Sequence, residues 1–305
     1  MTKFRLFVAR PVWENEPNKW LMELRGELNS EIAVYFLSIQ QLRLENSKLF
    51  LKELDRGLHG KANRSLFKKR KFLLFSSPAS VEAVFKIFQK LARRPDRLRN
   101  LRSLMSNIKK TFLSFNRKNG IKLGAIGEGT ATNLQQHFRK LSSRSPRLKR
   151  KNIYYLPANA TALAWVEEFG LRVKRYQVLA VGGKSNSDKL LSLLDKRSVR
   201  VRQMVPYSRV LENDANECKV DMLMAQGILP ASDFYENFIL ISSSQLVGPV
   251  LGKLELKLFD ENSFTLVSHH DQIVNKVKEI IPEIKVMKIQ SLDPKCIARE
   301  INSRL

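Results

Sequence analysis

The chain has 305 residues, of which 43% are hydrophobic and only 13 are Gly and 11 Pro, so it can form two packed cores. Two cysteines, Cys218 and Cys296, provide neither metal-type spacing nor a disulfide framework. The apolar run in MTKFRLFVARP is too short for a signal peptide, and no later stretch approaches the length of a membrane span. We therefore expect a cytoplasmic protein of two domains.

The formal net charge is +25, from 54 Lys and Arg residues against 29 Asp and Glu, which indicates an anionic partner. The excess is concentrated in three basic runs of the first half of the chain, at 61–72, 90–110 and 139–151. Nucleic acid, a polycarboxylate ligand and a solvated basic face kept for solubility are three interpretations of these runs.

Taken in chain order, the sequence repeats an apolar strand, a glycine or serine turn and an amphipathic helix, which is the pattern of parallel β–α–β construction. The five units begin with FRLFVARP (4–11), FLLFSSPASV (72–81), KLGAIGEGTA (122–131), QVLAVGGKSN (177–186) and FILISSSQLV (238–247). A further strand and helix are predicted at 152–170, and extended segments at 31–44 and 197–210. The predicted fold class is α/β, with two parallel-sheet domains that carry helices on both faces.

Neither glycine loop has the spacing of a nucleotide-binding motif. Gly124, Gly127 and Gly129 fall as G-x-x-G-x-G, whereas a dinucleotide fingerprint reads G-x-G-x-x-G. The Gly183-Lys184-Ser185 sequence imitates the end of a P-loop, but Val178 stands where the leading glycine is needed. The two loops need another explanation.

The stretches FLLFSSPASVEAVF and FILISSSQLVGPVL share an apolar tetrad, paired serines, a short step and an apolar helix face. This similarity predicts a weak internal duplication. Phe85, Phe88, Phe112 and Phe115 fall at helical spacing near the basic runs and are expected in the core, which does not favour a single-strand nucleic-acid platform.

The ordered set VARP, FSSPASV, IGEGTA, YYLPANATALA, VLAVGG, VPYSR and ISSSQLV resembles the uroporphyrinogen-III synthase family over nearly the whole chain. The resemblance implies two α/β domains joined by a two-strand connector, with a ligand cleft between them and no metal or organic cofactor. It implies a discontinuous domain 1, residues 1–36 and 208–305, and a domain 2 of residues 37–207.

The activity that the resemblance implies is a hydro-lyase reaction in which hydroxymethylbilane is cyclised to uroporphyrinogen III with inversion of ring D and loss of water. Tyr207 in VPYSR matches the family's connector tyrosine and would assist departure of the leaving hydroxyl, although tyrosine after proline in a connector is more often a packing residue. Turns at strand ends would bind the eight carboxylates of the substrate, and the expected substrate-binding residues are Arg10, Ser77, Gly127, Thr130, Lys184, Ser243 and Ser244. For Ser and Thr the competing interpretation is an ordinary helix cap, and for Arg10 an exposed residue at a strand end.

One segment departs from the family pattern. Where the second half of the family usually repeats an IG-x-x-TA turn, this chain has FTLVSHHDQIVNKV, with Ser268, His269, His270 and Asp271. The adjacent histidines lack a third ligand at convincing spacing, so a solvated loop is expected and no metal. The expected partner is a small polycarboxylate, with no membrane, and the protein is expected to be a monomer. The alternative is a non-catalytic member of the fold whose basic face binds nucleic acid or an acidic partner.

Overall fold

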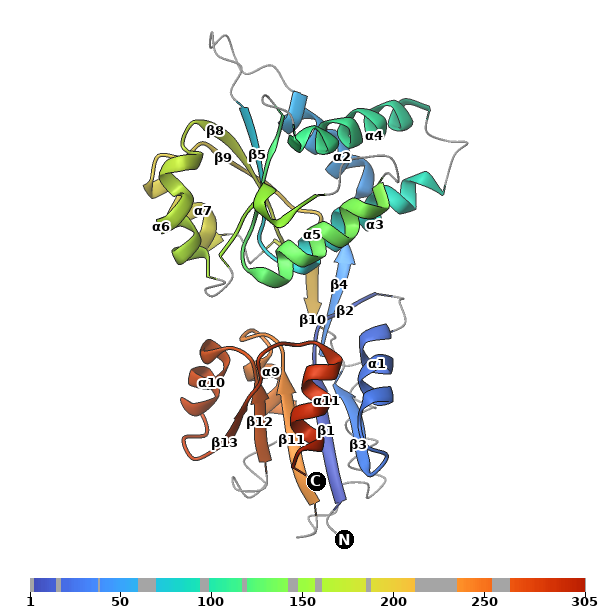
Figure 1. The fold of residues 1–305 in the computed structure, drawn as a ribbon, viewed down its shortest axis with the longest axis vertical. Helices are drawn as coiled ribbons and strands as arrows, with labels where there is room; N and C mark the ends of the chain where they lie inside the picture. Colours follow the sequence, from blue (N-terminus) through green and yellow to red (C-terminus); the bar gives the residue numbers. More distant parts are fainter. Residues whose placement is uncertain are drawn as a thin grey trace. The chain divides into compact units, whose positions relative to one another are not determined.

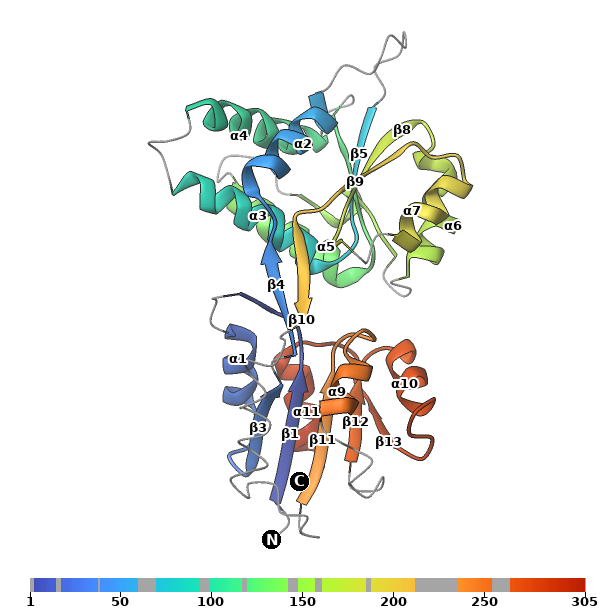
Figure 2. The same cartoon turned by 180° about the vertical axis from the view of Figure 1, so that it is seen from behind.

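In the computed structural model the chain divides into two compact units, unit 1 of residues 1–43 with 209–305 and unit 2 of residues 44–208. Each unit is an α/β structure built around a parallel five-stranded sheet with helices on both faces (Figures 1 and 2). The residues that the structure describes are 3–14, 18–37, 39–59, 70–93, 99–116, 120–141, 148–156, 161–184, 188–211, 235–253 and 264–304.

The sheet of unit 2 has the strand order β7-β6-β5-β8-β9. Its strands are β5 (Arg70–Phe75), β6 (Lys122–Ala125), β7 (Ile153–Tyr154), β8 (Tyr176–Val181) and β9 (Val201–Met204). Their near-continuous apolar runs are typical of strands that are covered on both faces. The helical segments of this unit are α2 (Ser47–His59), α3 (Pro78–Ala92), α4 (Arg99–Phe112), η1 (Leu113–Asn116), α5 (Glu128–Leu141), η2 (Arg150–Asn152), α6 (Ala162–Val173) and α7 (Asp188–Lys196).

Alternation along β5 divides unit 2 into two cores. Leu73 and Phe75 point to the face that is covered by α2, α3, α4 and α5, whereas Phe72 and Leu74 point to the face covered by α6 and α7. Phe85, Phe88 and Phe112 are buried in the first core, as predicted, and the side chain of Phe115 lies outside what the structure describes.

Unit 1 has the strand order β13-β12-β11-β1-β3. Its strands are β1 (Lys3–Ala9), β3 (Ile32–Leu37), β11 (Tyr235–Ile241), β12 (Phe264–Ser268) and β13 (Lys285–Lys288). One core lies between this sheet and α9 (Val247–Lys253) and α10 (Asp271–Lys278). The other lies between the sheet and α1 (Lys19–Glu27) and α11 (Pro294–Asn302).

The two sheets share one topology. In unit 2 the chain starts at the central strand β5, builds outward through β6 and β7, and then adds β8 and β9 on the other side. In unit 1, β11, β12 and β13 correspond to β5, β6 and β7, and β1 and β3 correspond to β8 and β9. The order along the chain differs, because β1 and β3 precede β11, β12 and β13 in the sequence. The strands and turns of the two similar stretches, β5 with Ser76-Ser77 and β11 with Ser242-Ser243, occupy the central place in both sheets. The predicted duplication agrees with this shared order.

The chain passes between the units at residues 43–44 and 208–209, within β4 (Gln40–Leu44) and β10 (Tyr207–Leu211). These strands are neighbours in a separate three-stranded sheet of order β10-β4-β2, which β2 (Val12–Trp13) completes. The predicted extended segment 31–44 is thus two strands, β3 and β4. The segment 197–210 also differs from a simple connector, because β9 pairs in parallel with β8 inside the sheet of unit 2.

The basic runs are only partly described. Residues 61–69, 94–98 and 142–147 lie outside the described residues. The basic run 90–110 contains the end of α3 at Ala92 and the start of α4 at Arg99. Within the described ranges, every helix is too short or too polar to cross a membrane.

Candidate functional site

The carboxyl ends of parallel strands meet at one edge of a sheet, and ligands of open α/β sheets bind where the strand order reverses direction. In unit 2 this switch point lies between β5 and β8. Backbone hydrogen bonds continue past the strands here and hold the turns side by side: Ser76 N donates to Val181 O at 3.0 Å, and Gly182 N donates to Met204 O at 3.1 Å. The turns after β5, β8 and β9 are therefore neighbours.

Ser77 starts α3 at this edge and forms a capping box with Ser80. Its hydroxyl accepts a hydrogen bond from Ser80 N at 3.2 Å, and Ser77 N donates to the Ser80 hydroxyl at 3.2 Å. Pro78 follows at the first helical position, where its missing N–H costs nothing. Ser77 is thus an ordinary N-cap, and it is half-buried.

Tyr207 is the first residue of β10, and its ring is fully buried. Its hydroxyl lies 3.3 Å from the Ser77 hydroxyl, so either atom can donate. The phenol is thereby held at the N-terminus of α3. The ring is buried, as the packing interpretation predicts, and its oxygen lies at the switch point.

Gly183, in the turn after β8, lies close to that ring. A Cβ at this position would lie 3.0 Å from Cε2 and Cζ of Tyr207 and 3.1 Å from its hydroxyl oxygen. Only glycine allows so close an approach of the backbone to the ring. Gly183 therefore serves packing against Tyr207, which explains this glycine without a phosphate loop. The next residue, Lys184, is exposed in the turn.

The IGEGTA turn follows β6. Gly127 has φ +82°, a left-handed conformation that only glycine adopts without strain. The helix α5 begins at Glu128, so Thr130 stands inside its first turn. Thr130 is buried, and its hydroxyl donates to Ile126 O at 2.9 Å. The structure thus places Thr130 as a side chain that closes the turn onto the helix.

The switch point of unit 1 lies between β11 and β1. Ser242 joins the two strand ends, because its N–H and its hydroxyl each lie 3.1 Å from Ala9 O. Arg10 follows directly, and its guanidinium carbon lies 4.5 Å above the Trp20 ring, whose indole N–H donates to Leu292 O at 2.8 Å. An arginine is thus positioned at this edge by a stacked tryptophan.

Ser243 and Ser244 are half-buried in the turn after β11. Both of their carbonyl groups are engaged: Ser243 O accepts from Leu246 N at 3.0 Å, and Ser244 O accepts from the Lys276 ammonium at 3.0 Å. Lys276 lies on α10, so the turn is braced from the helix that follows the neighbouring strand. The turn and Arg10 flank the same switch point.

His269 follows β12 at the same edge and is half-buried, which the expectation of a solvated loop did not foresee. Its pKa is lowered to about 4 by burial, then by the neighbouring His270 and by the positive charge of Arg10. The ring is therefore neutral at neutral pH. A neutral imidazole retains one N–H donor, which is the capacity that the missing threonine hydroxyl would have had. The sequence predicts only a solvated loop at His269, because burial of this side chain is not visible in the local pattern.

The structure gathers the predicted residues into two groups. Ser77, Gly127, Thr130, Lys184 and Tyr207 follow or begin elements at the carboxyl edge of unit 2, whereas Arg10, Ser243 and Ser244 lie at the carboxyl edge of unit 1. Their roles toward a ligand remain predictions. Among the residues that the structure describes, no group of three or more His, Cys, Asp and Glu side chains has the arrangement of a metal site.

The sequence matches no family model and no curated protein. Among solved structures, the chain is similar to a mutant uroporphyrinogen III synthase from the bacterium Thermus thermophilus, with 10% identity, a TM-score of 0.50 and coverage of 98% of both chains. It is similar also to uroporphyrinogen-III synthetase from Helicobacter pylori, with 14% identity, a TM-score of 0.50 and coverage of 97% of this chain and all of that one. The likeness spans both units, and the chain has the fold of the uroporphyrinogen III synthases.

Proposed function

We propose that this protein is a uroporphyrinogen-III synthase, a hydro-lyase of tetrapyrrole and heme biosynthesis that cyclises hydroxymethylbilane with inversion of ring D and loss of water. The observation that carries the proposal is the pairing of the Tyr207 and Ser77 hydroxyls at the switch point of unit 2, in a chain with this fold. We expect the enzyme to act as a cytoplasmic monomer without metal or organic cofactor.

The reaction requires the protein to position the substrate and to stabilise developing charge, more than it requires a strong acid or base. Loss of the terminal hydroxyl leaves an electrophilic azafulvene. The linear tetrapyrrole must then be held so that the macrocycle closes with ring D inverted. A phenol at neutral pH is a hydrogen-bond donor, and it can accelerate hydroxyl departure by about 10²-fold to 10⁴-fold. We assign this role to Tyr207, with Ser77 as the residue that orients its hydroxyl.

Substrate binding is assigned to groups that suit carboxylates. Arg10 offers a guanidinium, and Lys184 offers an exposed ammonium. The turns at Ser77, Gly127, Ser243 and Ser244 bring backbone close to a ligand. Thr130 contributes by fixing the IGEGTA turn, since its hydroxyl is engaged with Ile126 O. Asp271 stands where the family's second threonine is expected, and we propose that His269, two residues earlier, supplies the lost hydrogen-bond donor by its single neutral N–H.

The direct test is incubation with freshly made hydroxymethylbilane, followed by oxidation and chromatography of the porphyrin isomers. We expect isomer III to form faster than the uncatalysed isomer I. Isomer I alone, at the rate of the protein-free control, would contradict the proposed activity.

Substitution of Tyr207 tests its assigned role. Tyr207→Phe removes the hydroxyl and leaves the buried ring, so we expect turnover to isomer III to fall by about 10²-fold or more while folding is retained. Ser77→Ala should cost less turnover and also some stability, about 1 kcal/mol, because it removes the cap of α3. A folded Tyr207→Phe protein with full activity at saturating substrate would make Tyr207 a packing residue.

The non-catalytic alternative gains no support from the comparisons. It predicts that both variants keep every binding property of the wild-type protein and that neither protein forms isomer III. The isomer assay therefore separates the two functions.

A further inference from the structure

The basic excess of the chain belongs entirely to unit 2. Residues 44–208 hold 37 of the 54 Lys and Arg residues but only 10 of the 29 Asp and Glu. The remaining 17 basic and 19 acidic residues belong to unit 1, which is close to neutral. A ligand bound at the carboxyl edges of both units does not account for this division.

Six of the cations of unit 2 form a cluster that we call the basic corner. They are exposed and lie where α6 and α7 end and where β8 and β9 begin: Arg172, Lys174, Arg175, Lys196, Arg197 and Arg200. Strands of a parallel sheet begin at one edge, and the helices that return between them end there. The basic corner is therefore at the amino edge of the sheet, the end opposite to Ser77 and Gly183.

Packing between the two helices brings these cations together. A Cβ at Gly170, one turn before the end of α6, would lie 3.6 Å from Cγ of Arg197. The carbonyl of Arg200 accepts a hydrogen bond from Val178 N at 2.9 Å, which fixes Arg200 beside the start of β8. The guanidinium carbon of Arg175 lies 5.5 Å from the ring centre of Tyr176, the first residue of that strand. The backbone that carries these cations is therefore fixed at helix ends and strand starts.

The turn after α7 is itself fixed. Val199 N donates to Leu194 O at 3.0 Å and Ser198 N to Asp195 O at 2.7 Å, which is the hydrogen-bond pattern of a Schellman motif. Ser198 has φ +55° where glycine is usual. The motif holds Lys196, Arg197 and Arg200 around one tight turn.

Distance separates the basic corner from the candidate site. The strand β8 has six residues, so its ends are about 20 Å apart at about 3.3 Å per residue. The Debye length at physiological ionic strength is about 8 Å, so charges at the amino edge are largely screened at the carboxyl edge. Steering of a polycarboxylate substrate would require cations near the turns that receive it, and these six are at the wrong end of the sheet.

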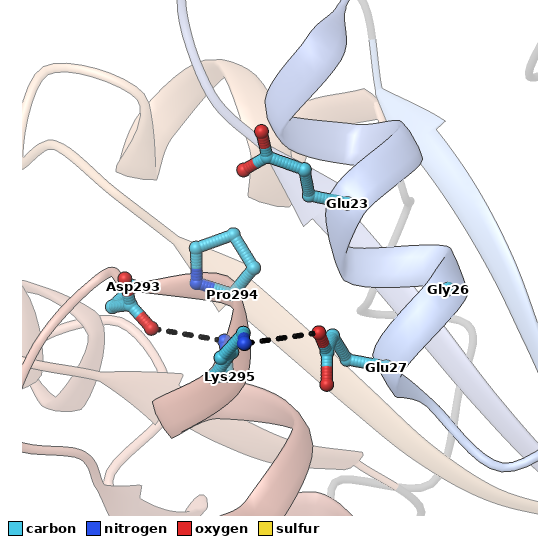
Figure 3. A pocket seen from close by; sticks show the side chains of 6 residues that line it. All are labelled: Glu23, Gly26, Glu27, Asp293, Pro294 and Lys295. Atoms are coloured by element: carbon cyan, nitrogen blue, oxygen red, sulfur yellow. Dashed lines mark hydrogen bonds and ion pairs between the residues drawn. The ribbon is translucent and has the colours of Figure 1, made fainter.

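Unit 1 supplies an internal control, because it has the same topology without the charge. Its helices α1 and α11 cover one face of its sheet as α6 and α7 do in unit 2. They leave a pocket of about 300 Å³ between them, lined by Glu23, Gly26, Glu27, Asp293, Pro294 and Lys295 (Figure 3). Three carboxylates thus face one ammonium where the two helices meet.

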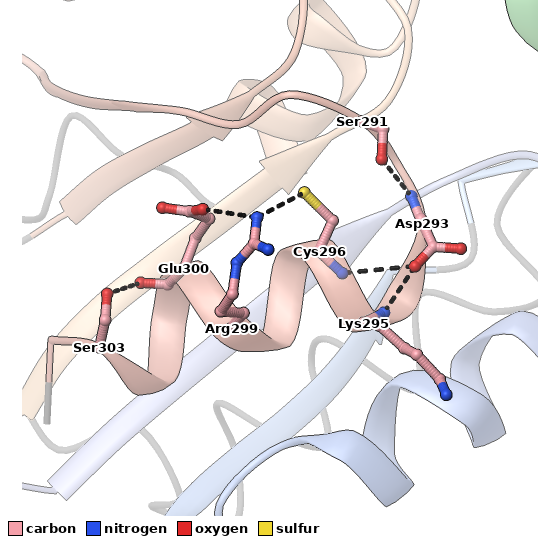
Figure 4. A network of polar contacts seen from close by, with 7 residues as sticks. All are labelled: Ser291, Asp293, Lys295, Cys296, Arg299, Glu300 and Ser303. Carbon is pink, nitrogen blue, oxygen red and sulfur yellow. Dashed lines mark hydrogen bonds and ion pairs between the residues drawn. The ribbon is translucent and has the colours of Figure 1, made fainter.

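The charges of α11 are engaged within unit 1. The Lys295 ammonium lies 3.8 Å from a Glu27 carboxylate oxygen, and Arg299 lies 3.2 Å from Glu300 (Figure 4). In the basic corner the comparable ion pair is Arg172 with Glu168, at 3.2 Å. At the place that corresponds to the basic corner, where α1 and α11 end, unit 1 carries both signs of charge, with Glu27, Glu300 and Arg304. The fold therefore does not require a cluster of cations there.

Helix capping by cations does not explain the basic corner either. A basic side chain in the last turn of a helix is worth about 0.3–1 kcal/mol, and the effect fades beyond that turn. Arg175 and Arg200 lie outside α6 and α7. Their positions fit a partner that contacts the whole amino edge of the unit 2 sheet.

We infer that the basic corner binds the phosphate backbone of a nucleic-acid duplex, independently of base sequence. Spaced Lys and Arg side chains are sufficient for this mode, which needs neither an apolar centre nor stacking. In the described part of the chain, the large hydrophobic side chains that are exposed include no aromatic residue, so a single-strand stacking platform is not favoured.

Two other anionic macromolecules fit less well. A protein partner would need a buried apolar or aromatic anchor, and Leu171 is the exposed large hydrophobic side chain that the described residues offer within the corner. A membrane surface would need an amphipathic helix with an exposed apolar face, whereas the apolar faces of α6 and α7 are buried in the core. Both remain outcomes of the experiment.

The experiment measures binding of the full chain to a fluorescent DNA duplex of about 20 base pairs and to an RNA duplex of the same sequence, by anisotropy over a series of salt concentrations. Six phosphate contacts predict a slope of about −5 in log affinity against log salt. Equal affinity for both duplexes identifies the phosphate backbone, which they share, as the ligand. Tighter binding to one duplex identifies DNA or RNA as the partner. Absence of salt-dependent binding to either duplex would refute the proposal.

A matched pair of variants locates the surface. The corner variant Lys174→Glu/Arg197→Glu/Arg200→Glu and the control variant Lys278→Glu/Lys285→Glu/Arg304→Glu change the net charge equally at exposed residues. We expect the corner variant to lose roughly tenfold or more in affinity at low salt, with a slope smaller by about 3, and the control to change less than about threefold. Equal losses in both variants would assign binding to net charge alone.

Competition separates the other partners. Tighter binding to vesicles of anionic phospholipid, or full displacement of the duplex by polyglutamate at equal charge concentration, would overturn the assignment to nucleic acid. Circular dichroism checks that the variants fold. The isomer assay is run in parallel, and both variants are expected to keep the wild-type rate, so failure of the proposed enzymatic activity and failure of this inference are distinguishable.

Discussion

At the scale of single residues, the contact between Ser77 and Tyr207 joins two positions that the sequence marked for different reasons. The sequence predicts Ser77 as a substrate-binding residue, with a helix cap as the competing interpretation, and Tyr207 by its match to a family motif. They are 130 positions apart, and their hydroxyls lie 3.3 Å from each other. The buried ring also explains Gly183 after β8, in a stretch that only imitates the end of a phosphate loop.

Gly183 is expected to be intolerant of a side chain. Gly183→Ala would bring a Cβ to 3.0 Å from the Tyr207 ring, so we expect it to lower the free energy of unfolding by about 1–3 kcal/mol. Gly248→Ala is the control, because a Cβ there meets nothing within 4 Å, and we expect no loss of stability. Chemical denaturation measures both, and equal effects of the two substitutions would argue against the close contact.

His269 should make stability depend on pH. Its pKa is lowered to about 4, chiefly by burial, from the ordinary value of 6.5, so the unfolded state binds the proton more readily than the folded state. The contribution is complete above pH 6.5 and is lost as pH falls toward 4. We expect His269→Asn to flatten the fall in unfolding free energy over this window, and His270→Asn, at an exposed position, to retain it.

Nuclear magnetic resonance of the ring protons provides the direct readout of the His269 pKa. A midpoint near the ordinary value of 6.5 for His269 would show that the ring is not buried as described. Because burial also lowers the pKa of His137, the His269 signal is assigned as the one that is absent from the His269→Asn protein.

At the scale of elements, the Schellman turn after α7 stores strain. Ser198 has φ +55°, where a side chain costs about 1 kcal/mol relative to glycine. We expect Ser198→Gly to raise the free energy of unfolding by up to about 1 kcal/mol. Ser192→Gly, an exposed position inside α7, should lower it by about 0.5–1 kcal/mol. Thermal unfolding measures the two shifts, and the same sign for both would contradict the assigned end of the helix.

Helix starts were predictable because they depend on neighbours in sequence. Ser77 with Pro78 begins α3 through hydrogen bonds that span three residues. Thr130 shows where this reasoning failed: α5 begins at Glu128, and the Thr130 hydroxyl donates back to Ile126 O. The choice between capping and back-bonding was decided by the left-handed conformation of Gly127, one residue before the helix begins.

At the scale of the whole molecule, the discontinuous domain is proposed from the resemblance, and the contacts divide the chain at residues 43–44 and 208–209. Because residues 44–208 contain a complete sheet with both of its cores, we expect this segment to fold alone. Expressed by itself, it should unfold cooperatively in denaturant. Residues 1–43 should remain unfolded alone, since β1 and β3 pair with each other but β1 lacks β11. A segment 44–208 without a cooperative transition would refute the division.

The sequence by itself determined the α/β class, the strand–turn–helix units and the serine caps, because these follow from apolar periodicity and from contacts within a few residues. Burial of Tyr207 against Gly183, the half-burial of His269 beside Arg10 and the gathering of six cations at the ends of α6 and α7 were decided only by the tertiary structure. Each depends on which strands are neighbours in the sheet. That order is set by the summed packing of two faces, a long-range quantity that no local pattern of residues contains.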